Sequence, residues 1–229
     1  YSIVTDNGQN LFDPGKKPAE NIRFLTFMCA FIEAVGNYAL LLRLSAASAG
    51  NDHRLGAHEA PPAIISIYLG SYIEDILFSL YQDHPSIRKD ASTVDFTPLT
   101  NLAYIPHDNA DRNRTSPLAF TGNKFEFRML GSSMSASFSN TVLNAIMAES
   151  LNGIAKQLEG IKYLQDVREK ALNICRQMIH DHKRILFSGD GYSEEWVKEA
   201  ERRGLPNVTS YIEATHVLKD PKVIHLFTS

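Results

Sequence analysis

The chain has 229 residues, of which 44% are hydrophobic, 21% charged and 10% aromatic. This composition predicts one or two folded domains and excludes disordered, collagen-like and disulfide-scaffold proteins. The net charge of −3 offers no basic surface for nucleic acid or for an anionic membrane, so we expect neither partner and favour a small-molecule site.

The two cysteines and the hydropathy pattern bear on location. Cys29 and Cys175 lie in separate apolar helical patterns, which argues against a zinc site or a disulfide framework. No apolar run approaches the roughly 18 residues that span a bilayer, and the N-terminus lacks the layout of a signal peptide. We therefore expect a cytoplasmic protein. The strand-like opening at Tyr1, without an initiator Met, predicts that the chain is part of a longer protein.

The first half of the chain contains two predicted helices and one predicted strand. Apolar residues spaced three and four apart predict a largely buried helix from Ile22 to about Arg43. Residues 44–62 show no sustained period and predict a loop. A β-branched run at residues 63–69 predicts a strand, and a helix is expected to continue through residues 73–80. The polar residues 83–113 predict a long connecting segment.

The second half contains the clearest strand and then turns helical. Apolar and charged side chains alternate within residues 120–130, as in a half-buried strand. Long helices are expected at about 139–159 and 162–187, separated near Gly160. Ser193 precedes two glutamates and a tryptophan, a pattern typical of a capped helix start.

The alternating strand provides the first candidate site. Because side chains alternate between faces, Glu126 and Arg128 share one face, about 7 Å apart, while Phe125, Phe127 and Met129 face the core. One interpretation is an exposed strand with a surface Glu and Arg. The other is a metal ligand beside an anion-binding arginine.

Three further polar segments are candidates. Residues 50–62 crowd ionisable groups and glycines into a loop, as functional loops often do, although His53 and His58 are poorly spaced for a metal pair. Residues 111–117 carry two arginines and two hydroxyls that could grip phosphate oxygens. Either segment could equally be an ordinary solvated loop. We expect residues 180–182, His-Asp-His, to lie on the surface at a helix end, and Trp196 to serve packing.

Two of these segments resemble a known family. The strings AGNDHRLGAHEAPP at 49–62 and NRTSPLAFTGNKFEFR at 113–128 resemble the catalytic region of type III glutamine synthetases. NGQNLFDPG at 7–15 and GYSEEW at 191–196 support the resemblance, which spans most of the chain. It covers only part of the family's longer chain.

The resemblance implies roles for four charged residues. Glu126 matches a carboxylate ligand of the magnesium that helps to hold the phosphates of ATP, and Mn²⁺ could replace Mg²⁺. Arg128 matches an arginine at the glutamate and phosphoryl-transfer site. Arg114 matches an arginine that contacts ATP phosphate and stabilises the transferring charge. Arg54 matches the arginine that grips the substrate carboxylate.

Three more positions have implied roles. Glu59 matches a flap glutamate that closes over the site and helps to deprotonate ammonium, whereas Ser2 and Lys124 match positions near the nucleotide. The commoner bacterial form has a further arginine where residues 118–120 are apolar here, and it places one more residue between the counterparts of Arg54 and Glu59. The family's other metal ligands and its N-terminal domain would all precede Tyr1.

The implied fold is α+β, a partial glutamine synthetase catalytic domain over residues 1–229 with a curved antiparallel sheet flanked by helices. The portion from about residue 139 onward would be helical, and the N-terminal domain would be absent. The implied protein is a large ring-shaped homo-oligomer, a dodecamer. It would use ATP to phosphorylate the γ-carboxylate of glutamate, and ammonia would displace the phosphate to give glutamine.

Two alternatives stay open. A ligase of the same fold could join glutamate to an amine other than ammonia, because none of these residues reports the size of an amine pocket. A non-catalytic relative could serve as a structural or binding protein, although the presence of all five charged candidates, Arg54, Glu59, Arg114, Glu126 and Arg128, argues against it.

Overall fold

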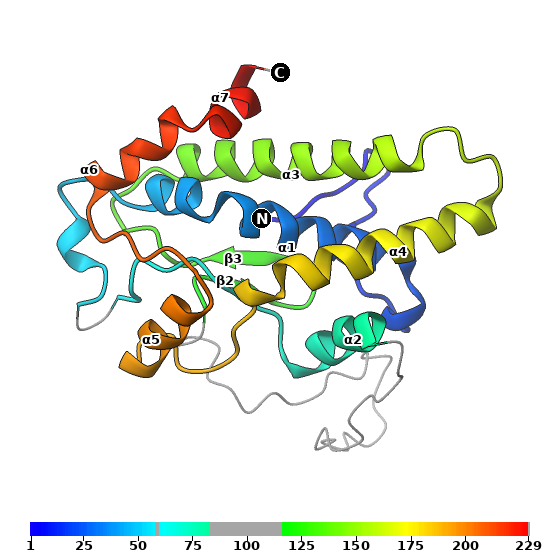
Figure 1. The fold of residues 1–229 in the computed structure, drawn as a ribbon, viewed down its shortest axis with the longest axis horizontal. Helices are drawn as coiled ribbons and strands as arrows, with labels where there is room; N and C mark the ends of the chain where they lie inside the picture. The colour runs from blue at the N-terminus through cyan, green and yellow to red at the C-terminus, as the bar shows by residue number, and fades with distance from the viewer. Residues whose placement is uncertain (58–59, 83–115, 229) are drawn as a thin grey trace.

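A computed structural model describes residues 1–57, 60–82 and 116–228 (Figure 1). Over these residues the fold is α+β, with one small sheet and a larger number of helices. The strands are β1 (Ile67–Tyr68), β2 (Leu118–Phe120) and β3 (Phe125–Phe127); the α-helices are α1 (Ile22–Ala46), α2 (Ser71–Gln82), α3 (Ser137–Leu158), α4 (Leu164–His182), α5 (Glu194–Arg202), α6 (Tyr211–Ala214) and α7 (Pro221–Thr228); the 3₁₀ helices are η1 (Pro18–Glu20), η2 (Asp52–Arg54), η3 (Lys183–Ile185) and η4 (Thr215–Lys219).

Helix α1 is the centre of the molecule. The Asn21 side chain caps it by accepting a hydrogen bond from the Phe24 amide, and the helix continues three residues beyond the predicted end at Arg43. It packs against both α3 and α4, and the sheet lies along its other side (Figure 1). Apolar side chains are therefore needed all around the helix, which explains why its pattern is so uniformly hydrophobic.

The hydropathy of α1 corrects one prediction. By length and composition this helix could cross a membrane, with a mean hydropathy of 1.7 over its most apolar 18 residues, although no such run was expected. A core helix of a folded domain meets the same criteria, and most of this window is buried inside the protein. Its hydrophobicity is therefore accounted for by packing.

The sheet is mixed, whereas the prediction was an antiparallel sheet. β2 and β3 form an antiparallel hairpin in which Ala119 pairs with Glu126, but β1 pairs with β2 in parallel. Only two residues of the predicted strand at 63–69 belong to β1. Leu186 lies beside this strand and forms an isolated parallel bridge with Ile67. A parallel pair cannot be joined by a tight hairpin, and α2 lies in the connection between β1 and β2.

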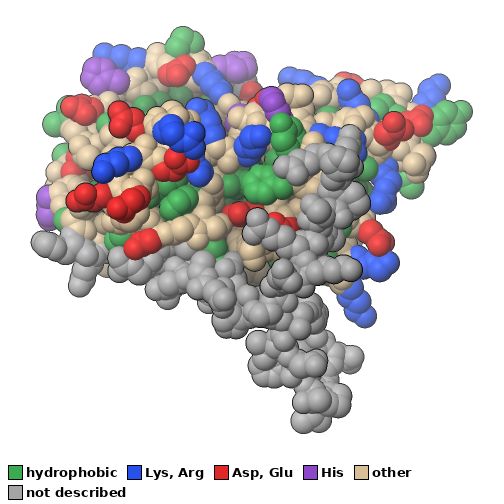
Figure 2. Space-filling view, turned by 60° about the horizontal axis from the view of Figure 1, so that its bottom comes forward, with side chains coloured by type: hydrophobic (Ala, Val, Ile, Leu, Met, Phe, Trp, Pro, Cys, Tyr) green, Lys and Arg blue, Asp and Glu red, His purple; other side chains and the backbone are tan. Residues whose placement is uncertain are grey.

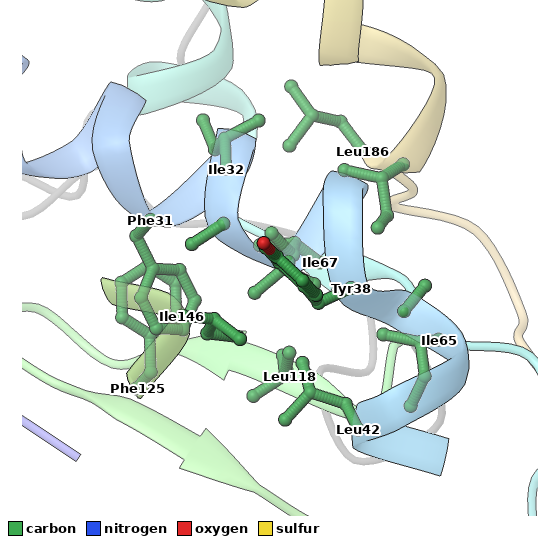
Figure 3. Packing of buried hydrophobic residues seen from close by; sticks show 14 of the residues in the cluster. Phe31, Ile32, Tyr38, Leu42, Ile65, Ile67, Leu118, Phe125, Ile146 and Leu186 are labelled. Atoms are coloured by element: carbon green, nitrogen blue, oxygen red, sulfur yellow. The ribbon is translucent and has the colours of Figure 1, made fainter. Parts of the chain in front are cut away.

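The core lies between the sheet and α1, and its most densely aromatic part surrounds β3. Phe125 is fully buried, and its ring stacks on Phe31 of α1 with centroids 3.8 Å apart (Figure 3). Phe12 packs edge-on against both rings. Met129 is also fully buried and Phe127 is half-buried, so the predicted inward face of this strand is confirmed.

This cluster leads to a stability prediction. In the full-length protein, Phe125→Ala should lower the free energy of unfolding by about 3–5 kcal/mol, because the lost ring leaves a cavity among Phe12 and Phe31. Urea unfolding followed by circular dichroism would measure it. Phe227→Ala is the control, since Phe227 is 47% exposed and should change stability by less than about 1 kcal/mol. A small effect of Phe125→Ala would contradict the packing described above.

The C-terminal half is helical, with α3 close to its predicted bounds and Gly160, at φ 79°, between α3 and α4. The Ser193 side chain accepts from the Trp196 amide, as the capping pattern predicted. Trp196 is buried and stacks on Phe187 with centroids 3.7 Å apart, which confirms its role in packing. The expected helix at 162–187 ends earlier, at His182, because the chain tightens into η3 before it joins β1.

Candidate functional site

Glu126 and Arg128 lie together on the outer face of β3, as the alternation predicted. Two nitrogens of the Arg128 guanidinium, Nε and Nη2, donate to Glu126 Oε2 over 3.1 and 2.8 Å. The Glu126 side chain is 45% exposed and that of Arg128 22%. The strand therefore presents a carboxylate and a guanidinium at the surface of the described structure, opposite the aromatic face that fixes the strand to the core.

Ser2 and Lys124 lie at the start of the same strand. The backbone of Tyr1 exchanges two hydrogen bonds with that of Phe125, of 2.7 and 2.8 Å, so the N-terminal residues extend the sheet beyond β3. This antiparallel pairing puts Ser2 in register with Lys124, and both residues are exposed. The Tyr1 ring packs in the core near Phe31, so Ser2, the next residue, points to the opposite face, which carries Glu126.

Arg54 reaches the far end of β3 from a distant part of the sequence. It ends η2, and its Nη2 donates to the Met129 carbonyl, one residue beyond Arg128, over 2.5 Å. Its Nε is buried and has no partner among the described residues. The contact requires a close approach at Gly131, where a Cβ would lie 2.9 Å from Asn51 Nδ2 and 3.6 Å from Arg54 Nε. A side chain at position 131 would thus push the Arg54 loop away from the strand.

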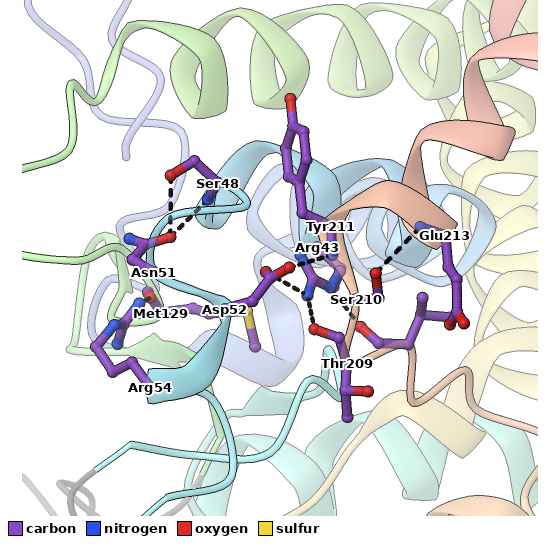
Figure 4. A network of polar contacts seen from close by, with 11 residues as sticks. Arg43, Ser48, Asn51, Asp52, Arg54, Met129, Thr209, Ser210, Tyr211 and Glu213 are labelled. Carbon is purple, nitrogen blue, oxygen red and sulfur yellow. Dashed lines mark hydrogen bonds and ion pairs between the residues drawn. The ribbon is translucent and has the colours of Figure 1, made fainter.

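Polar residues beside Arg54 stabilise its loop, and sequence reasoning missed them. The Ser48 amide donates to Asn51 Oδ1 over 2.6 Å. Arg43, only 1% exposed at the end of α1, pairs with Asp52 over 3.0 Å (Figure 4). The available signal was one arginine within an otherwise apolar helical run, because a buried guanidinium requires acceptors nearby.

Some of the remaining predicted site residues lie outside the part of the chain that the structure describes. Glu59 and Arg114 lie outside the described residues, as do His58 and most of residues 111–117. His53 is exposed, and within residues 1–57, 60–82 and 116–228 no group of three histidine, cysteine or acidic side chains could hold a metal ion.

The His-Asp-His sequence is only partly a surface feature. His180 and Asp181 are exposed and hydrogen-bonded to each other over 2.8 Å. His182 is half-buried against Gly36 of α1, where a Cβ would lie 2.7 Å from its Nδ1, and burial lowers the pKa of its ring. The prediction that all three residues lie on the surface is therefore wrong for His182, because the last turn of α4 packs on α1.

A divalent metal would find one suitable ligand here. Glu126 has the oxygen chemistry that Mg²⁺ and Mn²⁺ prefer, but one of its oxygens is engaged by Arg128. A single carboxylate cannot fill an octahedral coordination sphere. The described residues therefore cannot by themselves hold the ion, and any complete site needs ligands from elsewhere.

Sequence comparisons show which known proteins this chain resembles. A relative named Type-3 glutamine synthetase from Dictyostelium discoideum is 45% identical over 234 aligned residues, which include the whole of this chain. A glutamine synthetase from Butyrivibrio fibrisolvens is 43% identical, also over the whole chain. The chain resembles type III glutamine synthetase throughout its length. A glutamine synthetase from Bacteroides fragilis (strain YCH46) is 42% identical over 93% of the chain.

The comparisons also confirm the resemblance that the motifs indicated. Residues 170–229 match the glutamine synthetase C-terminal domain. The chain spans 31%, 32% and 30% of the lengths of these three glutamine synthetases. It thus corresponds to about a third of each relative.

Proposed function

We propose that the chain is part of an ATP-dependent glutamate–ammonia ligase and forms one portion of its catalytic domain. The proposal rests on a contact between two motifs that are far apart in the sequence. Arg54, from residues 49–62, hydrogen-bonds the backbone of Met129, directly after the motif that ends in Glu126 and Arg128. Three charged groups with the required chemistry therefore surround one end of β3.

The negative charge of the transferred phosphoryl group explains why the site needs cations. Moving the γ-phosphoryl group of ATP to the γ-carboxylate of glutamate brings several negative oxygens together, and fixed guanidinium groups would neutralise them. Arg54 would hold a carboxylate of glutamate through donors such as its buried Nε. Arg128 would lie beside the reacting carboxylate and phosphoryl group, and Arg114 would contact the phosphate.

Acidic and nucleotide-binding groups would complete the reaction. Glu59 would take a proton from ammonium, so that neutral ammonia can displace phosphate from the acyl phosphate. Ser2 and Lys124 would contact the nucleotide at the other end of β3, about 13 Å from Arg128 at 3.3 Å per residue. Glu126 would supply one carboxylate to Mg²⁺ or Mn²⁺, which when bound neutralises phosphate charge.

The assembly and location belong to the same proposal. The remaining metal ligands would come from residues outside this chain, and the protein would form a large ring-shaped homo-oligomer, a dodecamer. A cytoplasmic location stays a prediction. ATP, glutamate and ammonia are the proposed substrates, and neither nucleic acid nor a membrane is a proposed partner.

Steady-state kinetics of the full-length protein test the function. With ATP, Mg²⁺ and glutamate, ammonium should support formation of glutamine with stoichiometric release of phosphate. Methylamine in place of ammonium separates the proposal from a glutamate–amine ligase, which would prefer the alkylamine. A protein that turns over neither amine and binds no nucleotide would be the non-catalytic relative.

The isolated chain gives a further prediction. Purified residues 1–229 should form no measurable glutamine, because Glu126 is the one metal carboxylate that the family resemblance assigns to this segment and one ligand cannot hold the ion. The assay is ATP-dependent glutamine formation at saturating Mg²⁺, with the full-length protein as positive control. Turnover by the isolated chain would show that its own residues complete the site.

A further inference from the structure

The loop that carries Arg54 is attached to the C-terminal part of the chain at both of its ends. On the side before Arg54, Arg43 Nε donates to the Val208 carbonyl and Nη2 to the Thr209 carbonyl, each over 2.5 Å. On the side after it, Ile64 forms an antiparallel bridge with Asn207. Residues 207–211, which we call the clasp, thus hold both stems of the loop.

Asp52 connects the clasp directly to η2, two residues before Arg54. Its Oδ1 accepts from Arg43 over 3.0 Å, and its Oδ2 accepts from the Tyr211 amide at the first turn of α6 (Figure 4). Each carboxylate oxygen therefore has its own donor, one on α1 and one on α6. The Arg43 side chain is 1% exposed and that of Asp52 19%, so water competes weakly for these bonds.

We propose that the clasp, acting through Asp52 and Arg43, positions Arg54 for glutamate binding. This inference rests on the proposed function. It assigns to the matched C-terminal domain a role at the site, namely that residues 207–211 hold the substrate arginine against the Met129 carbonyl. Arg43, Asp52 and the Tyr211 amide are positioning groups, because they act through Arg54 and the described contacts give them no place beside the substrate.

Asp52→Asn in the full-length protein tests the connection. Whichever way the new amide turns, its NH₂ group faces a donor, either Arg43 or the Tyr211 amide, so one bond is lost. We expect the KM for glutamate to rise about 10- to 100-fold, the penalty for misplacing a binding group by about 1 Å, while the KM for ATP changes less than about twofold. Asp52→Glu, which keeps the charge and both acceptors, should recover part of the loss.

A second variant tests the same contact if Asp52→Asn does not fold. Tyr211→Pro removes the amide that donates to Asp52, at a helix position where proline is tolerated, and Ser210 before it already has an extended φ and ψ of −85° and 128°. Tyr211→Ala loses the same ring but keeps the amide. The proline variant should raise the glutamate KM above that of the alanine variant, and equal values would overturn the proposal.

A neighbouring control and an independent readout complete the test. Thr215→Ala, just outside the clasp, removes only the 2.6 Å hydrogen bond from its hydroxyl to the Ile212 carbonyl and should leave the glutamate KM unchanged. Amide hydrogen exchange of residues 51–55 should be faster in Asp52→Asn and Tyr211→Pro than in the two alanine variants. Unchanged exchange in both would also overturn the proposal.

Arg54→Ala separates this inference from the proposed function. If Arg54→Ala raises the glutamate KM but the clasp variants do not, the clasp is wrong and the function stands. If Arg54→Ala has no effect on glutamate binding, the assigned role of Arg54 fails. Exchange at residues 51–55 then still reports whether the clasp restrains the loop.

Discussion

Replacement of Glu126 by glutamine should reduce glutamine formation by the full-length protein at least about 100-fold. The amide keeps the shape of the side chain but loses the charge that a divalent ion requires. Thermal stability should change little, because Glu126 lies on the exposed face of β3 and the packing of Phe125 and Met129 is untouched. Activity measured against Mg²⁺ concentration and thermal unfolding would give the two results.

Glu199→Gln is the matched control for that experiment. Glu199 also pairs with arginines, at 2.7 Å from Arg202 and 2.6 Å from Arg203, but in α5. Hydrogen bonds from Arg202 and Arg203 lower its pKa to about 2, so it is charged at neutral pH. The control should keep its activity. Normal turnover and Mg²⁺ dependence in Glu126→Gln would mean that Glu126 and Arg128 form a surface ion pair only.

Replacement of Glu59 by glutamine should separate the two halves of the reaction. Without the carboxylate, ammonium keeps its proton, so glutamine formation should fall about 100-fold or more, as expected for the loss of a general base. Phosphorylation of glutamate does not need this proton transfer. Glutamate-dependent ATP hydrolysis should therefore continue slowly, and the KM values for ATP and glutamate should stay within about threefold.

A backbone hydrogen bond closes the loop that contains Glu59. At its base the Gly56 amide donates to the Pro61 carbonyl over 2.9 Å, and Gly56 has φ 78°, which favours glycine. His58→Gln is the control, because it changes the neighbouring side chain and leaves the carboxylate. Equal loss of glutamine formation and ATP hydrolysis in Glu59→Gln, or no loss of either, would contradict the assignment.

Local sequence patterns predicted much of this protein. The centres of α1, α3 and α4, the cap at Ser193 and the two faces of β3 follow from periodicity and capping, which depend on residues a few positions apart. The family resemblance also needed only the order of residues, and the comparisons confirmed it. Those features are local, so the amino-acid sequence alone is enough to predict them.

Other features depended on residues distant in sequence. The parallel pairing of β1 with β2 joins segments about fifty residues apart, and the burial of His182 results from α4 packing on α1. The sequence indicated only that Arg43 lies at the end of a helix, but its three hydrogen-bond acceptors lie 9, 165 and 166 residues away in the chain. A buried guanidinium is stable only where such acceptors converge, and that convergence is a property of the tertiary structure alone.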